Sequence, residues 1–210
     1  MAIIAGNVRI IAGTYRGRTI RAVPGLATRP TTDRIREAWA STVGSLLPNG
    51  FEDLVLLDAF AGSGALGIEA LSRGARQVVF CERNPKATEV LKKNLSIIDE
   101  NLQGTSILSG DIFSLRMERI LSKAGPFQLV VLDPPYSVSA TRIKELLLRF
   151  IQARIIADNA LVSYERPTQE ESDANMSVLL PLDSLTGLKM VSCKSYGTTT
   201  IEYLCFRESQ

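Results

Sequence analysis

Four apolar segments, each with an acid at or near its carboxyl end, place the strongest constraint on the fold of this chain. They are LVLLDAF (54–60), QVVFCE (77–82), TSILSGD (105–111) and FQLVVLD (127–133), which carry Asp58, Glu82, Asp111 and Asp133. The first lacks polar alternation, as is typical of strands buried on both faces of a parallel sheet. Helices are expected at 65–73, at 84–98 and near 140–151. Strands that alternate with helices predict an α/β fold with a mostly parallel, Rossmann-like sheet.

The last part of the chain departs from this alternation. NALVSYE (159–165) predicts a fifth strand, and KMVSCKS (189–195) and TTIEYLCFR (199–207) predict two more. The turn at Tyr196-Gly197 is too short for a crossover helix, so the last two strands must be antiparallel. We therefore expect the sheet to carry a C-terminal antiparallel hairpin.

The first fifty residues differ from the rest in pattern and charge. Residues 8–23 predict a β-hairpin, 24–33 a loop, and the following residues up to Pro48 a helix. Seven arginines there outweigh two acids, a balance of +5, whereas the whole chain carries only +2. We expect an N-terminal basic extension (1–50) and a main domain (51–210). Such an extension either contacts an anionic partner or is a solvated surface, and charge alone leaves both open.

The composition excludes several kinds of site. The chain has 210 residues, no histidine, and three widely spaced cysteines. Histidine triads, histidine metal sites and a paired disulfide framework are therefore excluded, and no metal is expected. No segment approaches the roughly 18 consecutive apolar residues of a membrane span. The start has no basic stretch before an apolar one, so we expect a cytoplasmic protein.

A glycine-rich segment follows the first acid. Gly62, Gly64 and Gly67 satisfy G-x-G-x-x-G between a predicted strand and a predicted helix. Such glycines permit a tight turn and let the backbone approach a ligand. The match alone fits an NAD-dependent oxidoreductase, or a turn that binds nothing.

The acids favour S-adenosylmethionine over NAD. A carboxylate at Asp58 suits an ammonium group and does not suit a pyrophosphate, while Glu82 could accept both hydroxyls of a ribose. Asp111 could accept the amino group of an adenine, although it could equally cap a helix. Ligands of open α/β sheets bind at the carboxyl ends of the strands, where all these acids are expected. Four such acids in succession are hard to explain by helix capping.

The fourth acid opens the sequence Asp133-Pro134-Pro135-Tyr136. Prolines fix φ and donate no hydrogen bond, so they frame the Asp133 carboxylate and the Pro134 carbonyl as two acceptors. Two acceptors could hold the N–H groups of an exocyclic base amine and make its lone pair available to a methyl donor. The Tyr136 ring could stack on that base. Alternatively, the segment is a strand end with a Pro-Pro turn and a core tyrosine.

These motifs together resemble one family. The segments 9–38, 58–75, 78–87, 110–113, 130–136 and 196–204 are similar, in order, to the bacterial small-subunit (16S) ribosomal RNA guanine-N2 methyltransferases of the RsmD type. The resemblance implies a class I methyltransferase fold and S-adenosylmethionine as cofactor. It also implies that the substrate is 16S ribosomal RNA within the 30S subunit or a late precursor. Trp39 and residues 168–184 depart from the family's pattern.

The resemblance also assigns roles to individual residues. It implies cofactor binding by Asp58, Phe60, Gly62, Gly64, Glu82, Asp111 and Ile112, and binding of the target guanine by Asp133, Pro134 and Tyr136. It implies RNA binding by Arg16, Arg18, Arg21, Arg29, Thr32 and Arg36, with residues 29–36 closing over the site. Three alternatives remain open: an adenine-N6 DNA methyltransferase, an NAD-dependent oxidoreductase, and a non-catalytic RNA-binding module.

Overall fold

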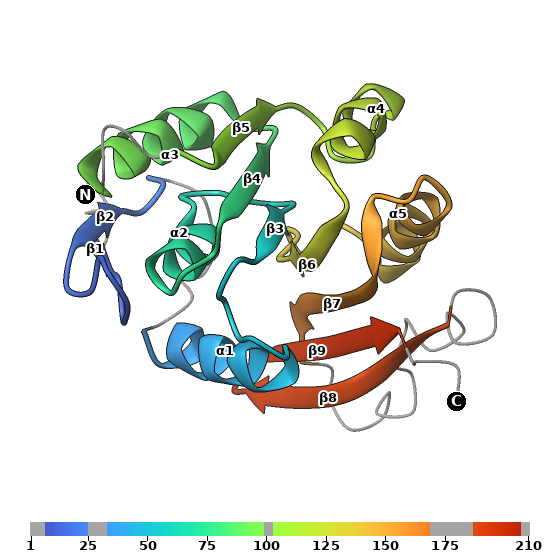
Figure 1. The fold of residues 1–210 in the computed structure, drawn as a ribbon. Helices are drawn as coiled ribbons and strands as arrows, with labels where there is room; N and C mark the ends of the chain where they lie inside the picture. The colour runs from blue at the N-terminus through green and yellow to red at the C-terminus, as the bar shows by residue number, and fades with distance from the viewer. Residues whose placement is uncertain (1–6, 25–32, 99–102, 169–186, 207–210) are drawn as a thin grey trace.

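The computed structural model describes residues 7–24, 33–98, 103–168 and 187–206. Its main sheet has seven strands (Figure 1). The first five in spatial order are parallel, and the sixth is antiparallel to both of its neighbours. In spatial order the strands are β5 (Thr105–Ser109), β4 (Gln77–Glu82), β3 (Val55–Asp58), β6 (Phe127–Leu132), β7 (Ile156–Pro167), β9 (Thr199–Phe206) and β8 (Leu188–Tyr196). The predicted parallel α/β sheet with a C-terminal antiparallel hairpin is confirmed.

Five helices of the described residues cover the two faces of this sheet. They are α1 (Asp33–Leu46), α2 (Ala65–Ser72), α3 (Pro85–Ile98), α4 (Leu115–Ala124) and α5 (Ala140–Gln152). Side chains of α1, α2 and α3 belong to one buried apolar cluster, and those of α4 and α5 belong to another. Successive side chains of β3 point to opposite faces of the sheet and belong to different clusters. Leu56 belongs to the first cluster, and Val55 and Leu57 belong to the second. Strand β3 lacks polar alternation, as expected, because helices cover both faces of the sheet.

The N-terminal hairpin packs into the first cluster. Its strands β1 (Asn7–Arg9) and β2 (Thr19–Arg21) are antiparallel, and they bury Val8 and Ile20 against the helices on that face. From α1, the Trp39 indole donates a hydrogen bond of 3.0 Å to Ser163 Oγ in β7. The two expected parts of the chain, 1–50 and 51–210, therefore share one hydrophobic core.

Two elements differ from the sequence prediction. Strand β5 ends at Ser109, so Asp111 lies two residues beyond it instead of closing it. Helix α4 was not expected; Ser114 caps it by accepting a hydrogen bond from Met117 N, and only Met117 and Leu121 are buried. No helix within the described ranges is long and apolar enough to cross a membrane.

Candidate active site

Three acids lie at the carboxyl ends of three neighbouring parallel strands. Asp58 ends β3, Glu82 ends β4, and Asp133 follows directly after β6. Parallel pairing of β3 with both β4 and β6 brings these ends to one edge of the sheet. Asp111 follows the end of β5, the next strand beyond β4. The predicted grouping of the acids along one rim is therefore present.

Asp58 is a buried carboxylate at the centre of this rim. It is 2% exposed, and its Oδ2 accepts a hydrogen bond of 3.2 Å from Gly67 N in α2. Burial raises its pKa to about 7, and the charges of Asp133 and Glu82 add to the rise. Among the described residues, no Lys or Arg forms an ion pair with Asp58. The site thus holds a carboxylate that lacks a cationic partner.

The glycine loop connects β3 to α2, as the motif predicted. Gly62 and Gly64 have φ angles of +54° and +83°, which other residues rarely adopt. A side chain at Gly64 would also lie 2.4 Å from Leu91 Cδ1, and one at Gly67 would lie 2.3 Å from Phe80 Cε1. Packing alone therefore favours glycine at positions 64 and 67.

Glu82 closes the glycine loop from the neighbouring strand. One carboxylate oxygen accepts a hydrogen bond of 2.8 Å from Gly62 N, and the other accepts one of 2.7 Å from Asn84 N. Each oxygen of a carboxylate has a further lone pair, so both can still accept from a ligand. Glu82 therefore fixes the loop and remains able to bind two hydroxyl groups.

A second set of contacts surrounds Asp111. The Asp111 carboxylate accepts a hydrogen bond from Phe113 N and lies 3.9 Å from the Arg142 guanidinium. That guanidinium lies 4.0 Å from the centroid of the Phe113 ring, which packs against Phe60 with centroids 6.0 Å apart. Ile112 is 3% exposed. The predicted residues Phe60 and Asp111 thus share one cluster with Phe113 and Arg142, which sequence reasoning missed.

The Asp133–Tyr136 turn lies at the end of β6. Pro134 is buried, Tyr136 is 60% exposed, and Val138 N donates to Pro135 O at 2.8 Å. The alternative of a core tyrosine is therefore wrong, because the ring faces solvent. An exposed ring beside a carboxylate is available for stacking on a planar ligand.

A small cavity joins Asp133 to a carboxylate that the sequence analysis did not single out. Glu165 follows Tyr164, the register partner of Leu132, so the two acids follow paired residues of adjacent strands. Both line the cavity, together with Trp39 and Ser163. Burial raises the pKa of Asp133 to about 6, and burial together with the charge of Asp133 raises that of Glu165 to about 8. Within the described ranges, no three His, Cys, Asp or Glu side chains form a group that could hold a metal ion.

A family model described as "Conserved hypothetical protein 95" matches residues 8–204. The chain belongs to this family. It is 31% identical to "Putative rRNA methyltransferase YlbH" of Bacillus subtilis (strain 168), over 92% of this chain and 96% of the relative. It is 33% identical to "Ribosomal RNA small subunit methyltransferase D" of Escherichia coli (strain K12), over 77% of this chain and 75% of the relative.

A solved structure supports the same relationship. "Putative methyltransferase yhhF from Escherichia coli" superposes with a TM-score of 0.75 at 28% identity, covering 98% of this chain and all of that chain. The predicted resemblance to the RsmD-type family is confirmed by these relatives. Their names favour neither a DNA methyltransferase nor an oxidoreductase.

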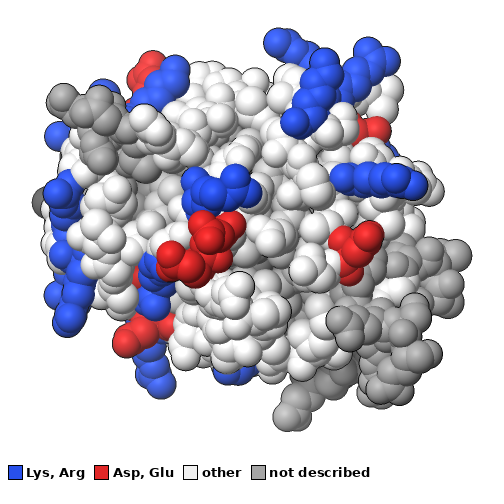
Figure 2. Space-filling view, in the orientation of Figure 1, with Lys and Arg blue, Asp and Glu red and all other residues white. Residues whose placement is uncertain are grey.

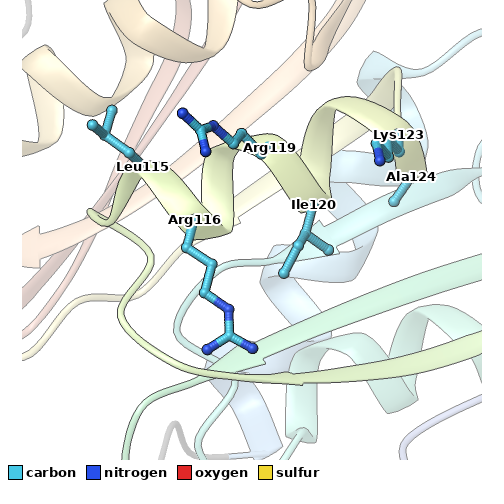
Figure 3. Close-up of a pocket in the computed structure, with 6 residues that line it drawn as sticks. All are labelled: Leu115, Arg116, Arg119, Ile120, Lys123 and Ala124. Carbon is cyan, nitrogen blue, oxygen red and sulfur yellow. The ribbon is translucent and has the colours of Figure 1, made fainter.

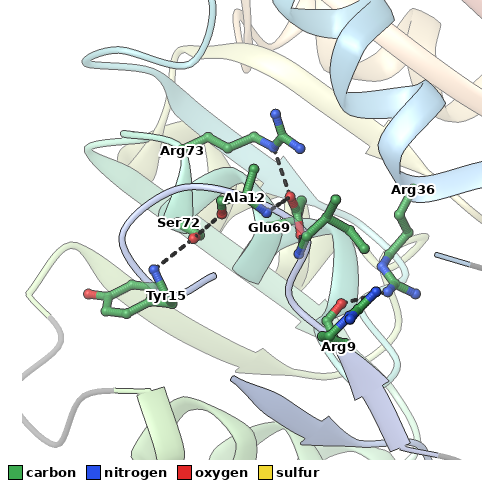
Figure 4. Close-up of polar contacts among 8 residues, drawn as sticks. Arg9, Ala12, Tyr15, Arg36, Glu69, Ser72 and Arg73 are labelled. Carbon is green, nitrogen blue, oxygen red and sulfur yellow. Dashed lines mark hydrogen bonds and ion pairs between the residues drawn. The ribbon is translucent and has the colours of Figure 1, made fainter. Parts of the chain in front are cut away.

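The N-terminal hairpin is fixed to α2 by polar contacts (Figure 4). The Glu69 carboxylate accepts hydrogen bonds from Ile11 N at 2.9 Å and from Ala12 N at 3.2 Å, and it pairs with Arg73 at 2.8 Å. Tyr15 N donates to Ser72 Oγ at 3.0 Å. The hairpin loop is thus held by the helix that also bonds Asp58.

The arginines predicted to bind RNA have different surroundings. Arg16 and Arg21 are exposed. The Arg18 guanidinium donates to the carbonyls of Ile97 and Ile98 at the end of α3, so it also has a structural role. Arg29 and Thr32 lie outside the described residues.

Arg36 conflicts with its predicted role in contacting RNA. It is 2% exposed, and its guanidinium donates to Asp33 and to the carbonyl of Arg9, both at 2.7 Å. A buried guanidinium held by a carboxylate and a carbonyl joins α1 to the hairpin. Its position in an arginine-rich segment did not distinguish it from the exposed arginines.

Proposed function

We propose that the protein transfers a methyl group from S-adenosylmethionine to the exocyclic N2 amine of a guanine in small-subunit ribosomal RNA. The observation that carries the proposal is the rim where Asp58, Glu82 and Asp133 lie together beside the exposed Tyr136. The names of the relatives support ribosomal RNA as the substrate. We further propose that this RNA is bound within the 30S subunit or a late precursor.

The residues of the rim fit S-adenosylmethionine by charge and by hydrogen-bonding capacity. Asp58 would receive the amino group, because an adjacent cation lowers the cost of keeping a buried carboxylate ionised. Glu82 would hold the ribose hydroxyls through its remaining lone pairs, with the glycine loop already fixed against it. Asp111 and Ile112 would lie beside the adenine. When bound, the cofactor supplies a methyl group on a positively charged sulfur.

Asp133 and Pro134 would hold the target amine. The exocyclic amine of guanine is a weak nucleophile because its lone pair is delocalised into the ring. The Asp133 carboxylate and the Pro134 carbonyl would accept its two N–H groups and favour a geometry in which the lone pair faces the methyl donor. Tyr136 would stack on the base, which in paired RNA must first be flipped out.

The deciding experiment supplies methyl-labelled S-adenosylmethionine to the protein with 30S subunits from cells that lack it, in parallel with duplex DNA. Nucleoside mass spectrometry should find the label as N2-methylguanosine in ribosomal RNA. Label found only as N6-methyladenine in DNA, or no label in either, would reject the proposal. The control is Asp133→Asn, which should bind cofactor normally but transfer methyl groups about 100-fold more slowly or worse.

A further inference from the structure

Helix α4 presents a cationic outer face on the side of the sheet away from the hairpin. Its buried residues, Met117 and Leu121, pack into the second apolar cluster. The opposite side of the helix carries Arg116, Arg119 and Lys123, all exposed. Their spacing of three and four residues places them on one face, spanning about 10 Å along the helix axis.

These three cations line a shallow hollow together with apolar side chains (Figure 3). The apolar residues are Leu115, which is 66% exposed, Ile120 and Ala124. Lys and Arg side chains gather over this part of the molecule in Figure 2.

The cations of this face have no counter-ion within the described part of the chain. The acid of α4, Glu118, is paired with Arg149 of α5, whose Nε lies 2.7 Å from its carboxylate. No ion pair to Arg116, Arg119 or Lys123 occurs among the described residues. Unpaired cations grouped on one helix face are complementary to a partner with regularly spaced negative charges.

The position of α4 relates this face to the acidic rim. The helix begins four residues after Asp111, and Ser114 N donates to the Asp111 carbonyl at 3.0 Å. Its first turn therefore starts at the rim. The hairpin, with exposed Arg16 and Arg21, packs on the other face of the sheet. Because the rim itself carries carboxylates, which repel phosphates, an RNA chain that reaches it needs cations on the flanks.

We propose that Arg116, Arg119 and Lys123 bind phosphates of the substrate RNA, so that the strand crosses the rim between the hairpin on one face and α4 on the other. Leu115 and Ile120 would contact ribose carbons between the phosphates. This inference rests on the proposed function for the identity of the RNA, but the surface can be tested by binding alone.

The test compares two variants that each remove three positive charges. One is Arg116→Gln, Arg119→Gln and Lys123→Gln together. The control is Arg154→Gln, Lys189→Gln and Lys194→Gln together. Arg154 lies between α5 and β7, and the two lysines lie on β8, the edge strand opposite β5. Binding of a 16S ribosomal RNA transcript is measured from 50 to 300 mM KCl. Thermal unfolding verifies that each variant is folded.

The slope of log affinity against log salt should be smaller in magnitude for the α4 variant than for the wild type, by about 2–3. Each lost phosphate contact removes about 0.7–0.9 from this slope. The α4 variant should bind about tenfold more weakly or worse in 100 mM KCl, and the control should keep the wild-type slope. Equal slopes for the two variants would overturn the proposal.

Methyl transfer to 30S subunits gives a second measurement. The α4 variant should show a raised KM with nearly unchanged kcat, because its residues do not touch the reacting atoms. If it binds the transcript as the control does and yet has a raised KM for 30S subunits, the face binds a ribosomal protein and the RNA proposal is wrong. Failure of wild-type methylation would remove the proposed function, while the salt slopes would still decide the role of α4.

Discussion

Replacing Asp58 by Asn should make the cofactor-free protein more stable, by an amount that grows with pH. Asp58 is 2% exposed, and its pKa is raised from 3.8 to about 7, mainly by burial. The hydrogen bond from Gly67 N lowers this pKa, while the nearby charges of Asp133 and Glu82 raise it. An Asn side chain keeps an acceptor for Gly67 N and never has to be ionised inside the protein.

The direction follows from proton binding. The carboxyl group binds its proton more tightly in the folded state than in the unfolded state. Its contribution to stability is therefore complete below about pH 4 and is lost as the pH rises to about 7. One pKa unit corresponds to about 1.4 kcal/mol, so between pH 5 and pH 8 the wild type should lose about 3 kcal/mol that the Asn variant does not lose.

Urea unfolding at pH 5 and pH 8 measures this difference. The advantage of Asp58→Asn over wild type should widen by about 3 kcal/mol between the two pH values, whereas Asp158→Asn, at an exposed position, should show no such change. An equal advantage at both pH values, or a variant less stable than wild type at pH 8, would refute the reasoning. Saturating S-adenosylmethionine should stabilise the wild type and not the variant.

Four further predictions concern other acids. Glu69→Ala should lower the free energy of unfolding by about 3–5 kcal/mol in urea titrations, because it leaves two backbone N–H groups and a cation unpaired; the exposed Glu89→Ala should change it by less than about 0.5 kcal/mol. The rate of methyl transfer should fall as the pH drops through about 6, because a protonated Asp133 is a weaker acceptor for the amine N–H than the carboxylate is. Glu165→Gln should keep this limb of the pH profile, since Glu165, with a pKa of about 8, is already protonated there; a limb that moves would contradict this. Glu82→Ala should weaken cofactor binding in calorimetry about tenfold or more, by loss of hydrogen bonds to a charged group.

The strands along the chain, their mostly parallel pairing and the position of the rim could be predicted from the sequence because they follow local rules. Apolar runs such as that of β3 indicate strands covered on both faces, and parallel strands necessarily bring their carboxyl ends to one edge. Asp58, Glu82 and Asp133 could therefore be grouped without knowledge of the tertiary structure. The C-terminal antiparallel hairpin could also be predicted from local sequence, because the turn at Tyr196-Gly197 is too short for a crossover helix.

Contacts between distant segments could not be predicted in this way. Arg142 of α5 meets Phe113 in the loop before α4, and Glu165 of β7 lines a cavity with Asp133, which follows β6. Neither partner is indicated by spacing along the chain. Helix α4 was not predicted, and only two of its side chains, Met117 and Leu121, are buried. Arg36 was expected to bind RNA from the family resemblance, and its burial could not be foreseen because its partners, the Asp33 carboxylate and the Arg9 carbonyl, are brought together by the fold.

Helix α2 connects the N-terminal hairpin loop to the acidic rim at Asp58. Near its start, Gly67 N donates to Asp58, and near its end Glu69 and Ser72 hold the hairpin loop. Gly13 fits there because its φ is +84° and any side chain would lie 1.6 Å from the Ser72 carbonyl oxygen. Residues from Leu66 to Ser72 are buried, and a close-packed interior transmits strain from one end of the helix to the other. The hairpin and the glycine loop are thus held by the same helix. On the proposed function, the fold would set the distance between an RNA phosphate bound at the hairpin and the rim, and that distance would select which guanine reaches Asp133.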